Sequence, residues 1–556
     1  MEKSVNGLNL VSPPKLPISK ITTRYNLTGL WRQKPPPKFI PKTSPCKNGC
    51  PLNQNIPEAL ELIKQGKNKE ALRLWIQNNP LPSVCGRVCR HFCEEKCSRN
   101  DYDGAVKIGN IERFIGDSGL KNNWSFDFPP NSGSKKRIAV IGSGPAGLAA
   151  VYFLRKAGMK IDFFEKEKNP GGVGRLIPGY RLPSGILTEE TKKIIAAQEF
   201  NEIKFINQAS LDESFIKNVL KNNFYGAAII ATGANEKKPL NIPGENSKMV
   251  LNALNFLAEE KPESAPKKIL IIGGGNTAID AGRTARRIYP RAEIKIVCPE
   301  NRNKMPAYKT ETDAALLEDI EIKNCLLPLQ IKESDDCLEI KFCEVEFETD
   351  ANGEIMFLPT DSYCFEETEI ILTAVGSKVK IPFLETPNEE EKEKIFIIGD
   401  SSDNFGSISK AMASGKNAVA RLLNFLETGE KQNNKESSLA VADIAFINLD
   451  YFWKKPPCRD KRLYLNSHKL KKEIANNFSE LTETWSEYIL EQEIERCFSC
   501  GVCVSCDNCV LFCPDLAVIK TSAQEEVYEI DKNYCKGCGI CVKECPRGVL
   551  ELGFRV

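Results

Sequence analysis

The sequence predicts an α/β fold with two Rossmann-type units and a cysteine-rich domain on each side of them. The first observation is a repeated pattern of strand, glycine turn and helix, RIAVIGSGPAG and KILIIGGGNTA. The others are six cysteines before the first pattern and two four-cysteine runs after the second. We therefore expect two nucleotide-binding domains, one inserted in the other. A helical iron–sulfur domain would precede them, and an α+β ferredoxin-like domain would follow.

The composition is that of an ordinary soluble protein. Its 76 basic and 74 acidic residues leave a formal net charge of +2, which argues against a nucleic-acid surface. The first residues, MEKSVNGLNLVSPPK, lack the apolar core of a signal peptide, and the apolar runs are shorter than a membrane span. The sequence thus predicts a cytoplasmic protein that binds neither nucleic acid nor a membrane.

The first Rossmann pattern follows an apolar strand directly. Gly142 permits the tight turn, Gly144 lets the backbone approach a pyrophosphate, and Gly147 allows close packing of helix and strand. The second strand, KIDFFE, ends in a carboxylate that would accept ribose hydroxyls. A glycine-rich turn without a nucleotide is the alternative. The candidate residues of this pattern are Gly142, Ser143, Gly144, Pro145, Ala146, Gly147, Glu165 and Lys166.

Segments farther along the chain complete this unit. One strand ends at Thr232 and Gly233, and IFIIGD returns after the second pattern, with Asp400 placed to bond the ribityl or phosphate region of a flavin. A helix beginning near Ile408 points its amide end at the same place. Neither unit contains a Cys-x2-Cys or Cys-x4-Cys pair, so we expect no redox-active dithiol. Further candidate residues are Gly171, Gly172, Val173, Gly399, Gly406 and Ser407.

The second pattern, together with the first, implies two nucleotides that face each other. Its second strand, EIKIVCPE, ends at Glu300, and an acid there favours NAD because it would repel a 2′-phosphate. Arg302 leaves NADP open as the alternative nucleotide, since its side chain is placed to reach the 2′-phosphate. The candidate residues of this unit are Gly273, Gly274, Gly275, Asn276, Thr277, Ala278, Glu300, Arg302 and Gly376.

The N-terminal part combines a basic arm with clustered cysteines. Residues 1–45 contain eight Lys and Arg and the triplet PPP, which indicates an extended arm that wraps its own protein or a partner, or else a disordered tail. Cys85, Cys89, Cys93 and Cys97 recur every fourth residue, so a helical turn would bring several thiols to one side. Thiols concentrated in this way favour an iron–sulfur cluster, with zinc as the alternative.

The two C-terminal runs have the spacing of bacterial ferredoxins, in which the fourth cysteine of each run binds the other cluster. We interpret the upstream Cys497 and Cys500 as non-ligands. Zinc is a poor alternative for two matched runs that each end in Pro. One predicted [4Fe-4S] ligand set is Cys503, Cys506, Cys509 and Cys545, and the other is Cys513, Cys535, Cys538 and Cys541.

Composition also divides the chain into segments. The segment SELTETWSEYILEQEIER is predicted to be helical, with Ser479 as its N-cap. The predicted boundaries are 1–133 for the arm and helical iron–sulfur domain, 134–240 and 377–428 for the two parts of the FAD-binding domain, 241–376 for the NAD(P)-binding domain, 429–490 for a helical connecting arm, and 491–556 for the ferredoxin domain.

With these motifs in view, the chain resembles the small-subunit family of glutamate synthase between about residues 45 and 425. The resemblance is carried by PCxxxCP, NPLPxxCGRVC, GSGPAG, IPGYRLP, GGGNxAxD, MPA and the final GD. It is similar also to part of dihydropyrimidine dehydrogenase. The appended ferredoxin runs look like a branch of stand-alone iron–sulfur oxidoreductases that accompany partners such as 2-oxoacid oxidoreductases or dissimilatory sulfite reductase.

The resemblance implies roles for individual residues. Cys50, Cys89 and Cys93, with Glu112, would hold a cluster near the flavin, and Arg181 would contact the flavin. Cys46 and Cys97 would share a second cluster with a Cys-x2-Cys pair upstream of Cys46. This chain lacks that upstream pair, so the second cluster is in question unless Cys85 replaces a ligand. Where family members that use NADPH carry two arginines, this chain has Pro299 and Glu300.

We therefore expect an FAD- and iron–sulfur-dependent NAD(P)H:acceptor oxidoreductase that prefers NADH and exchanges electrons with a protein partner, such as a ferredoxin. No catalytic side chain is expected, because the flavin and clusters carry the chemistry and the chain has two histidines. A homodimer or a subunit of a larger complex is compatible with this. The alternatives are a glutamate synthase small subunit that awaits its large partner, and a non-catalytic electron-relay subunit.

Overall fold

The computed structural model describes most of the chain. The described residues are 27–32, 34–40, 42–131, 136–199, 201–209, 215, 224–234, 236–258, 262, 264–334, 337–349, 355–380, 393–403, 406–429, 443–458, 474–482, 484–521 and 528–552. Predictions about residues 1–26 therefore lie outside them. None of the helices in the described part of the chain combines the length and the hydropathy that a membrane crossing needs.

The first Rossmann pattern forms a parallel five-stranded sheet. Its strand order is β16-β5-β2-β3-β4. The strand β2 carries the buried sequence RIAVI and leads through the glycine turn into helix α8. The long helix α15 packs along α8, and Gly415 permits this because a Cβ there would lie 2.4 Å from the Ala146 carbonyl oxygen. The bounds are β2 Arg137–Ile141, β3 Lys160–Phe164, β4 Ile203–Ile206, β5 Tyr225–Ile230, β16 Ile395–Ile397, α8 Pro145–Lys156, η2 Gly172–Leu176, α9 Ser184–Ile195, η4 Gly399–Ser401 and α15 Ile408–Thr428.

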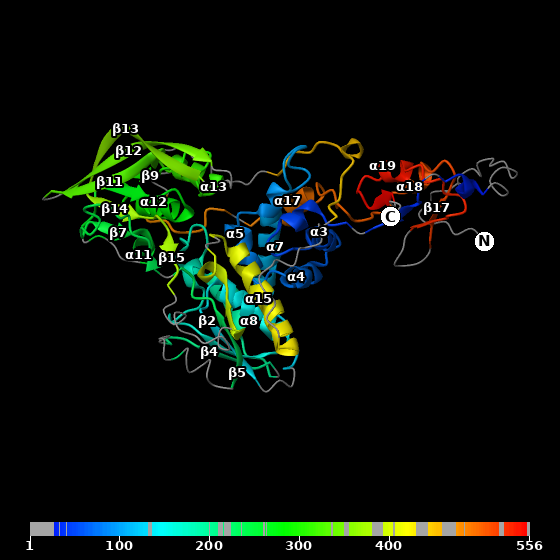
Figure 1. Cartoon of the computed structure of the whole chain (residues 1–556), viewed down its shortest axis with the longest axis horizontal. Coiled ribbons are helices and arrows are strands. Elements are labelled where there is room, and N and C mark those ends of the chain that lie inside the picture. Colours follow the sequence, from blue (N-terminus) through cyan, green and yellow to red (C-terminus); the bar gives the residue numbers. More distant parts are fainter. Residues whose placement is uncertain are drawn as a thin grey trace.

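The second pattern forms another parallel sheet, of order β10-β9-β8-β14-β7. In the sequence, this sheet is inserted between β5 and β16 of the first sheet, so the chain passes between the two sheets twice. The short strands β6 and β15 lie in these two connections and pair antiparallel with each other. A three-stranded antiparallel sheet, β11-β12-β13, covers it (Figure 1). The bounds are β6 Glu236–Lys237, β7 Val250–Asn252, α11 Ala253–Leu257, β8 Lys268–Ile272, α12 Asn276–Ile288, β9 Glu293–Val297, α13 Lys309–Leu317, β10 Glu321–Lys323, β11 Leu326–Glu333, β12 Leu338–Thr349, β13 Ile355–Thr368, β14 Ile370–Thr373 and β15 Ser377–Lys378.

The N-terminal cysteines lie in a helical domain that packs against α8 and α15 of the first sheet. The four cysteines from Cys85 to Cys97 are divided between two short helices and the residues that follow them. Helix α5 ends before Cys89, and His91 has a left-handed backbone with φ 58°, so α6 starts in a new direction. The bounds are α2 Pro45–Gly49, α3 Ile56–Lys64, α4 Asn68–Ile76, α5 Pro82–Val88, α6 Phe92–Glu95 and α7 Ile108–Lys121.

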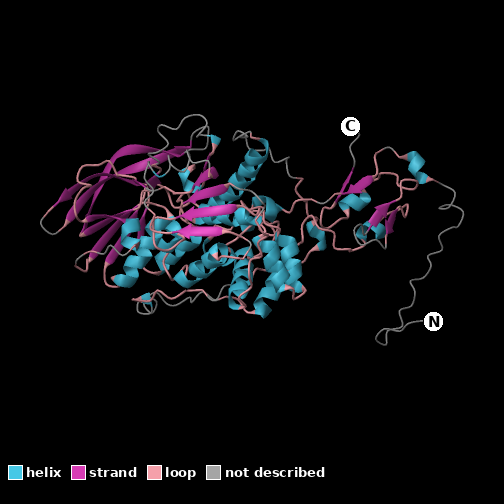
Figure 2. Cartoon of the chain, turned by 90° about the horizontal axis from the view of Figure 1, so that it is seen from below, coloured by secondary structure: helices cyan, strands magenta, loops and turns pink. Residues whose placement is uncertain are grey.

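The ferredoxin module incorporates part of the N-terminal arm. Strand β1 pairs antiparallel with β19, so this described part of the arm adds a strand to the module, which lies at the end of the molecule near the C-terminus (Figure 2). Gly29 N donates to Asn533 O at 2.7 Å, and Arg32 Nε donates to Cys535 O at 3.1 Å. The bounds are η1 Thr28–Trp31, β1 Pro37–Phe39, α18 Asn508–Leu511, β17 Val518–Lys520, β18 Tyr528–Ile530, α19 Ile540–Lys543 and β19 Leu550–Leu552.

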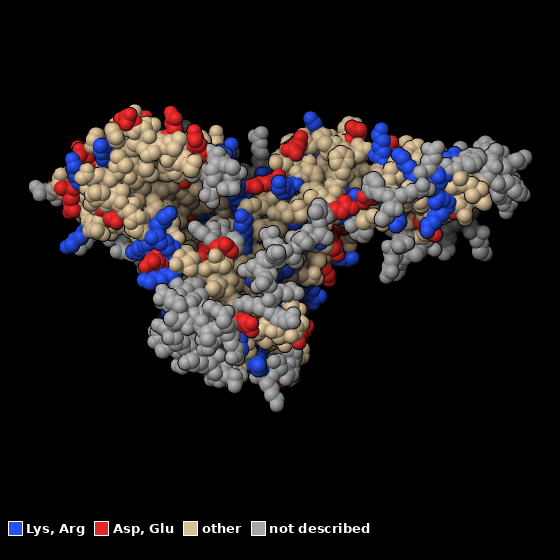
Figure 3. Space-filling view, viewed as in Figure 1, with Lys and Arg blue, Asp and Glu red and all other residues tan. Residues whose placement is uncertain are grey.

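The described helix before this module starts later in the sequence than predicted. Helix α17, Glu487–Ile494, has Ser486 as its N-cap residue, so the prediction of a helix that starts at Ser479 was wrong. The short η5 helix, Leu449–Tyr451, is a further helical piece in the described part of 429–490, and Ile474 is also helical. Acidic and basic side chains intermingle over the face drawn in Figure 3, as expected from the balanced composition.

Candidate functional site

The first glycine turn requires two of its glycines for close packing. Gly142 has φ 99°, and a Cβ there would lie 2.4 Å from Ala231 O. A Cβ on Gly147 would lie 1.9 Å from Gly142 O. At Gly144, by contrast, a Cβ would have no described neighbour within 4 Å. The helix N-terminus thus opens onto a space that a pyrophosphate could occupy, and the turn fits the predicted dinucleotide.

Glu165 is buried under this turn. Its Oε2 accepts hydrogen bonds from Ser143 N at 2.8 Å and from Ser143 Oγ at 2.5 Å, and its Oε1 accepts one from Glu167 N at 2.8 Å. The carboxylate therefore holds the turn in shape from within. Lys166 is exposed and lies 3.7 Å from Glu167, while Val173 is also exposed on η2.

The remaining residues predicted for this unit border the same turn. Gly399 approaches Ala146, where a Cβ would lie 2.7 Å from the alanine Cβ. Ser401 Oγ lies 3.3 Å from Thr232 Oγ1 and donates to Gly233 O at 3.3 Å. These contacts bring the ends of β5 and β16 together at the helix N-termini. Asp400 lies in η4. Ser407, which follows Gly406, is the N-cap of α15, and Ile408 is the first residue of that helix. Gly171 N donates a hydrogen bond to Ser143 O, and Gly172 packs closely against Gly144.

The second glycine turn has the same geometry. Gly273 has φ 141° and packs against Ala374 O, and a Cβ on Gly275 would have no described neighbour within 4 Å. The carboxylate of Glu300 lies over Gly274, where a Cβ would be 2.6 Å from Oε2. This Oε2 is buried and has no hydrogen-bond partner in the described part of the chain. An unpartnered buried acceptor is costly, so a ligand that donates hydroxyl hydrogens fits here.

The rest of the second unit surrounds this acceptor. Arg302 lies 3.5 Å from Asp313 and is partly exposed. Ala307 N donates to Gly274 O, and Tyr308 N donates to Asn276 Oδ1, both at 3.0 Å, so the MPA segment is fixed on the turn. Thr277 and Ala278 lie in the first turn of α12, and Gly376, with φ 93°, follows β14.

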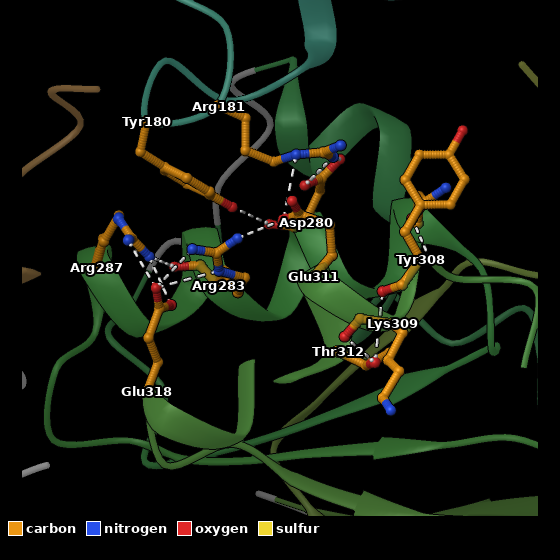
Figure 4. A network of polar contacts seen from close by, with 11 residues as sticks. Tyr180, Arg181, Asp280, Arg283, Arg287, Tyr308, Lys309, Glu311, Thr312 and Glu318 are labelled. Carbon is orange, nitrogen blue, oxygen red and sulfur yellow. Dashed lines mark hydrogen bonds and ion pairs between the residues drawn. The ribbon is translucent and has the colours of Figure 1, made fainter. Parts of the chain in front are cut away.

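Arg181, which the resemblance predicts to contact a flavin, contacts the second domain (Figure 4). Its Nη1 donates to both oxygens of Asp280, at 2.8 and 2.7 Å, and its Nε lies 3.3 Å from Glu311. The guanidinium of Arg287 lies over the neighbouring Tyr180 ring, and its central carbon is 3.8 Å from the centroid of the ring. Neither contact was predicted, and the charged residues that α12 buries are the signal that could have revealed them. The segment IPGYRLP therefore joins the two nucleotide domains.

The cysteines predicted to lie near the flavin gather in the helical domain. Cys50, Cys89 and Cys93 influence one another's ionisation, and all three lie near Glu112. Glu112 is buried, and its Oε1 accepts from Trp75 Nε1 at 2.8 Å and from Asn79 Nδ2 at 2.6 Å. Burial raises the pKa of Glu112 to about 7 despite these donors. Three thiols and a buried carboxyl group fit a cluster with one oxygen ligand.

The structure places this group beside the first nucleotide site. Cys89 Sγ and Ser409 Oγ are 3.5 Å apart, and Ser409 lies in the first turn of α15. Tyr308 of the second domain is also near enough for Cys89 to raise its pKa, although burial is the larger cause. Both nucleotide domains and the cysteine group therefore meet at one place.

Cys85 and the pair Cys46 and Cys97 lie in different surroundings. Cys85 is buried near Glu112 and Cys89, so the proposal that it joins Cys46 and Cys97 was wrong. Cys46 and Cys97 instead line a cavity with Cys497 and Cys500. Sequence reasoning missed this contact, and the unused Cys-x2-Cys spacing at 497–500 was the available signal.

The ferredoxin cysteines form two groups with the predicted crossing. Cys541 is influenced by Cys513, Cys535 and Cys538, and these four line one cavity of about 330 Å³. In the other group, Cys509 is influenced by Cys503, Cys506 and Cys545. Burial raises the pKa of Cys509 and of Cys541 to about 12, so a bound cation would be needed to keep these thiols ionised. Within the described residues, no three His, Cys, Asp or Glu side chains are grouped as a single metal ion requires. The sulfurs instead border a space, and this fits a cluster of several atoms.

Comparison with protein families identifies these regions. A model described as "Pyridine nucleotide-disulphide oxidoreductase" matches residues 136–415. Residues 41–124 match the 4Fe-4S cluster domain II of dihydropyrimidine dehydrogenase, and residues 528–551 match a 4Fe-4S binding domain. These matches confirm the predicted fold class, FAD and NAD(P) binding, and the presence of 4Fe-4S domains.

Individual relatives agree with this. The Escherichia coli O157:H7 protein YgfK is 27% identical over 530 residues, which cover 90% of this chain and 48% of YgfK. The beta subunit of the NADPH-Fe(3+) oxidoreductase of Geobacter sulfurreducens is 31% identical over 64% of this chain and 54% of its own length. The glutamate synthase [NADPH] small chain of Escherichia coli K12 is 28% identical, over 69% of this chain and 88% of that relative.

The chain spans about half the length of YgfK and of the Geobacter subunit. The glutamate synthase small chain confirms the resemblance found in the sequence. Because the family model covers half of the chain, from before β2 into α15, the protein is a member of the pyridine nucleotide-disulphide oxidoreductase family, with a 4Fe-4S domain on each side of the matched region.

Proposed function

We propose that this protein passes electrons between NADH and a protein redox partner. When bound, the flavin exchanges a hydride with the nicotinamide, and the [4Fe-4S] clusters carry single electrons. The side chains bind and orient these groups. The observation that carries the proposal is the meeting of both nucleotide domains with the cysteine group, through Ser409 and Tyr308 beside Cys89.

The first turn would bind FAD and the second would bind the nicotinamide nucleotide. Gly144 and Gly275 leave space at the N-termini of α8 and α12, where the amide ends attract a pyrophosphate. Arg181 and Asp280 fix the second domain relative to the first, so they hold the orientation of the two bound nucleotides.

Glu300 supports NADH as the preferred nucleotide. Its buried, unpartnered oxygen lies beside the turn, where it would accept a ribose hydroxyl hydrogen and repel a phosphate. Several relatives carry NADPH or NADP in their names, so this preference separates the chain from them. Arg302 lies near Asp313, which would compete with a phosphate for its charge.

The partner would receive electrons at the ferredoxin module. Relatives described as formate dehydrogenase and glutamate synthase subunits suggest that the chain works beside another subunit. A ferredoxin, a 2-oxoacid oxidoreductase or a sulfite reductase is the kind of partner proposed, in the cytoplasm. The presence of the ferredoxin module favours a protein that works with such a redox partner over a glutamate synthase small subunit.

An anaerobic titration tests the proposal. We expect NADH to bleach the flavin absorbance faster than NADPH does. Equal rates would remove the preference for NADH and retain the oxidoreductase. Failure of both nucleotides to reduce the flavin in a protein with full flavin and iron content would contradict the proposal and favour a non-catalytic relay.

A further inference from the structure

Four cysteines from distant parts of the chain border one cavity outside the groups described so far. Two belong to the helical domain, and two follow α17 directly. The space in this cavity and its opening to solvent has a volume of about 360 Å³, and its other walls are mostly apolar, with Leu60 and Ile108 among them. The four cysteines are Cys46, Cys97, Cys497 and Cys500.

The four cysteines line the same cavity, as the ligands of a common group would. Cys97, Cys497 and Cys500 are each close enough to Cys46 for an electrostatic interaction with its thiol. All 22 cysteines of the chain are free, so no disulfide accounts for this arrangement. A hydrophobic cavity does not need four thiols, since apolar side chains would fill it better.

The ferredoxin module offers an internal comparison. The cavity between Cys513, Cys535, Cys538 and Cys541 has a volume of about 330 Å³, close to the 360 Å³ found here. In the ferredoxin group, Cys513 Sγ accepts a hydrogen bond from Ala517 N at 3.2 Å. The two cavities therefore agree in size and in the number of sulfurs around them.

Polar groups also surround the sulfurs of the new site. Cys497 Sγ accepts a hydrogen bond from Ser499 N at 3.4 Å. Ser98 Oγ lies 3.4 Å from Cys500 Sγ, and Ser44 Oγ lies 3.4 Å from Cys46 Sγ. Hydrogen bonds to sulfur are among the features that set the potential of an iron–sulfur cluster.

Arg547 supplies an independent observation. Its Nε and Nη1 are buried, and neither has a hydrogen-bond partner in the described part of the chain. Burial has the largest effect on its charge, and the charged groups near it are the thiols of Cys497, Cys500, Cys506 and Cys545. Its guanidinium also lies 4.9 Å from the centroid of the Phe452 ring. A buried cation without a carboxylate partner is costly, and four thiolates around an iron–sulfur core would provide the missing negative charge.

We propose that the chain holds an additional [4Fe-4S] cluster whose ligands are Cys46, Cys97, Cys497 and Cys500. The Cys-x2-Cys pair that the resemblance places upstream of Cys46 is replaced by the pair at 497–500, which returns from the other end of the sequence. Cys497 and Cys500 were interpreted as non-ligands because their spacing was compared with the ferredoxin runs alone.

The location gives this cluster a connecting role. Cys46 and Cys50 lie at opposite ends of α2, and Cys97 follows the end of α6, which contains Cys93. Arg547, two residues after Cys545, has Cys497, Cys500 and Cys545 among its electrostatic neighbours. The site therefore joins the cysteine group at the flavin to the ferredoxin module. This role rests on the proposed function, whereas the site itself does not.

Iron and sulfide analysis of anaerobically prepared protein tests the proposal. We expect the double variant C497A/C500A to lose about four iron atoms and four sulfides per chain, with FAD content unchanged. The matched control is Cys458→Ala, because Cys458 lies in the same region, with its N–H donating to Glu493 and its thiol near Ile489 O. That control should retain all of the iron.

Unmodified protein gives a second measurement that does not depend on how the variants fold. It should contain about 16 iron atoms per chain, against about 12 if the site is not a cluster. Unchanged iron in the double variant overturns the proposal, and so does one zinc per chain that the double variant loses. These outcomes are independent of whether NADH reduces the flavin, so failure of this inference is distinct from failure of the proposed function.

Discussion

Arg181 and Asp280 form a buried ion pair, with 2.7 Å between Nη1 and Oδ2, that joins the two nucleotide domains. Breaking a buried pair from one side commonly costs about 3–5 kcal/mol, because one charge stays buried. Arg181 keeps Glu311 at 3.3 Å, so we expect Asp280→Asn to lower the free energy of unfolding of these domains by about 3 kcal/mol.

Urea denaturation followed by flavin fluorescence measures this change. The control is Asp313→Asn, which removes the partner of Arg302 at 3.5 Å on the surface and should change the free energy by about 0.5 kcal/mol or less. A similar effect of both variants would show that the buried pair does not hold the domains together.

Two glycines of the first turn should respond differently to alanine. Gly147→Ala places a Cβ 1.9 Å from Gly142 O, so we expect a loss of stability above the about 1–3 kcal/mol typical of an overpacked core. Gly144→Ala meets no described atom within 4 Å, and its φ of −67° suits alanine. This second variant should fold but bind flavin about tenfold more weakly, a loss of about 1.4 kcal/mol.

Circular dichroism and flavin content separate the two effects. If Gly144→Ala retained wild-type flavin affinity, the open side of the turn would not be the pyrophosphate site.

Charge reversal at Glu300 tests the nucleotide assignment. We expect Glu300→Arg to lower the ratio of kcat/KM for NADH to that for NADPH by about tenfold or more, because a cation replaces the carboxylate next to Gly274. Glu321→Arg on the neighbouring strand β10 is the control, and its exposed side chain should leave the ratio unchanged. An unaltered ratio in Glu300→Arg would remove this residue from the nucleotide site.

Glu190 should make stability depend on pH. It is buried on α9 and accepts from Ser83 N at 2.7 Å and Val84 N at 3.0 Å, at the start of α5. Burial raises its pKa to about 8 against these donors. Between the unfolded value of about 4.5 and about 8, the folded chain keeps a proton that the unfolded chain releases, so stability falls as pH rises.

The slope due to this group is at most about 1.4 kcal/mol per pH unit. Glu190→Gln resembles the protonated carboxyl group and should remove this part of the loss between pH 5 and 8. Denaturant unfolding at several pH values measures it, and identical slopes in the two proteins would contradict the assignment.

The sequence predicted well what short segments determine. Gly142 and Gly147 are required by contacts within one turn, so the glycine spacing was enough to identify both Rossmann units and the fold class. The crossed arrangement of the ferredoxin cysteines likewise follows from a local repeat.

Features that depend on distant segments were not predicted. The positions of Cys497 and Cys500 depend on how α17 packs against the helical domain, which spacing alone does not contain. The spacing of Cys85 to Cys97 suggested that a helical turn gathers several thiols, but it did not reveal the left-handed backbone at His91 that separates α5 from α6. The family resemblance predicts that Arg181 contacts the flavin. The ion pair of Arg181 with Asp280 depends on how the second domain packs against the first, which the sequence alone does not show.

The pairing of β1 with β19 has a consequence for the order of folding. During synthesis Pro37 is made early and Leu552 late, and contacts such as Thr28 with Tyr534 span 506 positions. The entropic cost of closing so long a loop is little greater than the cost of closing a shorter one, but contacts between distant segments form slowly. The arm must therefore wait until the intervening domains have been translated. Completion of the ferredoxin module is therefore a late step of folding, because it requires both β1 and β19.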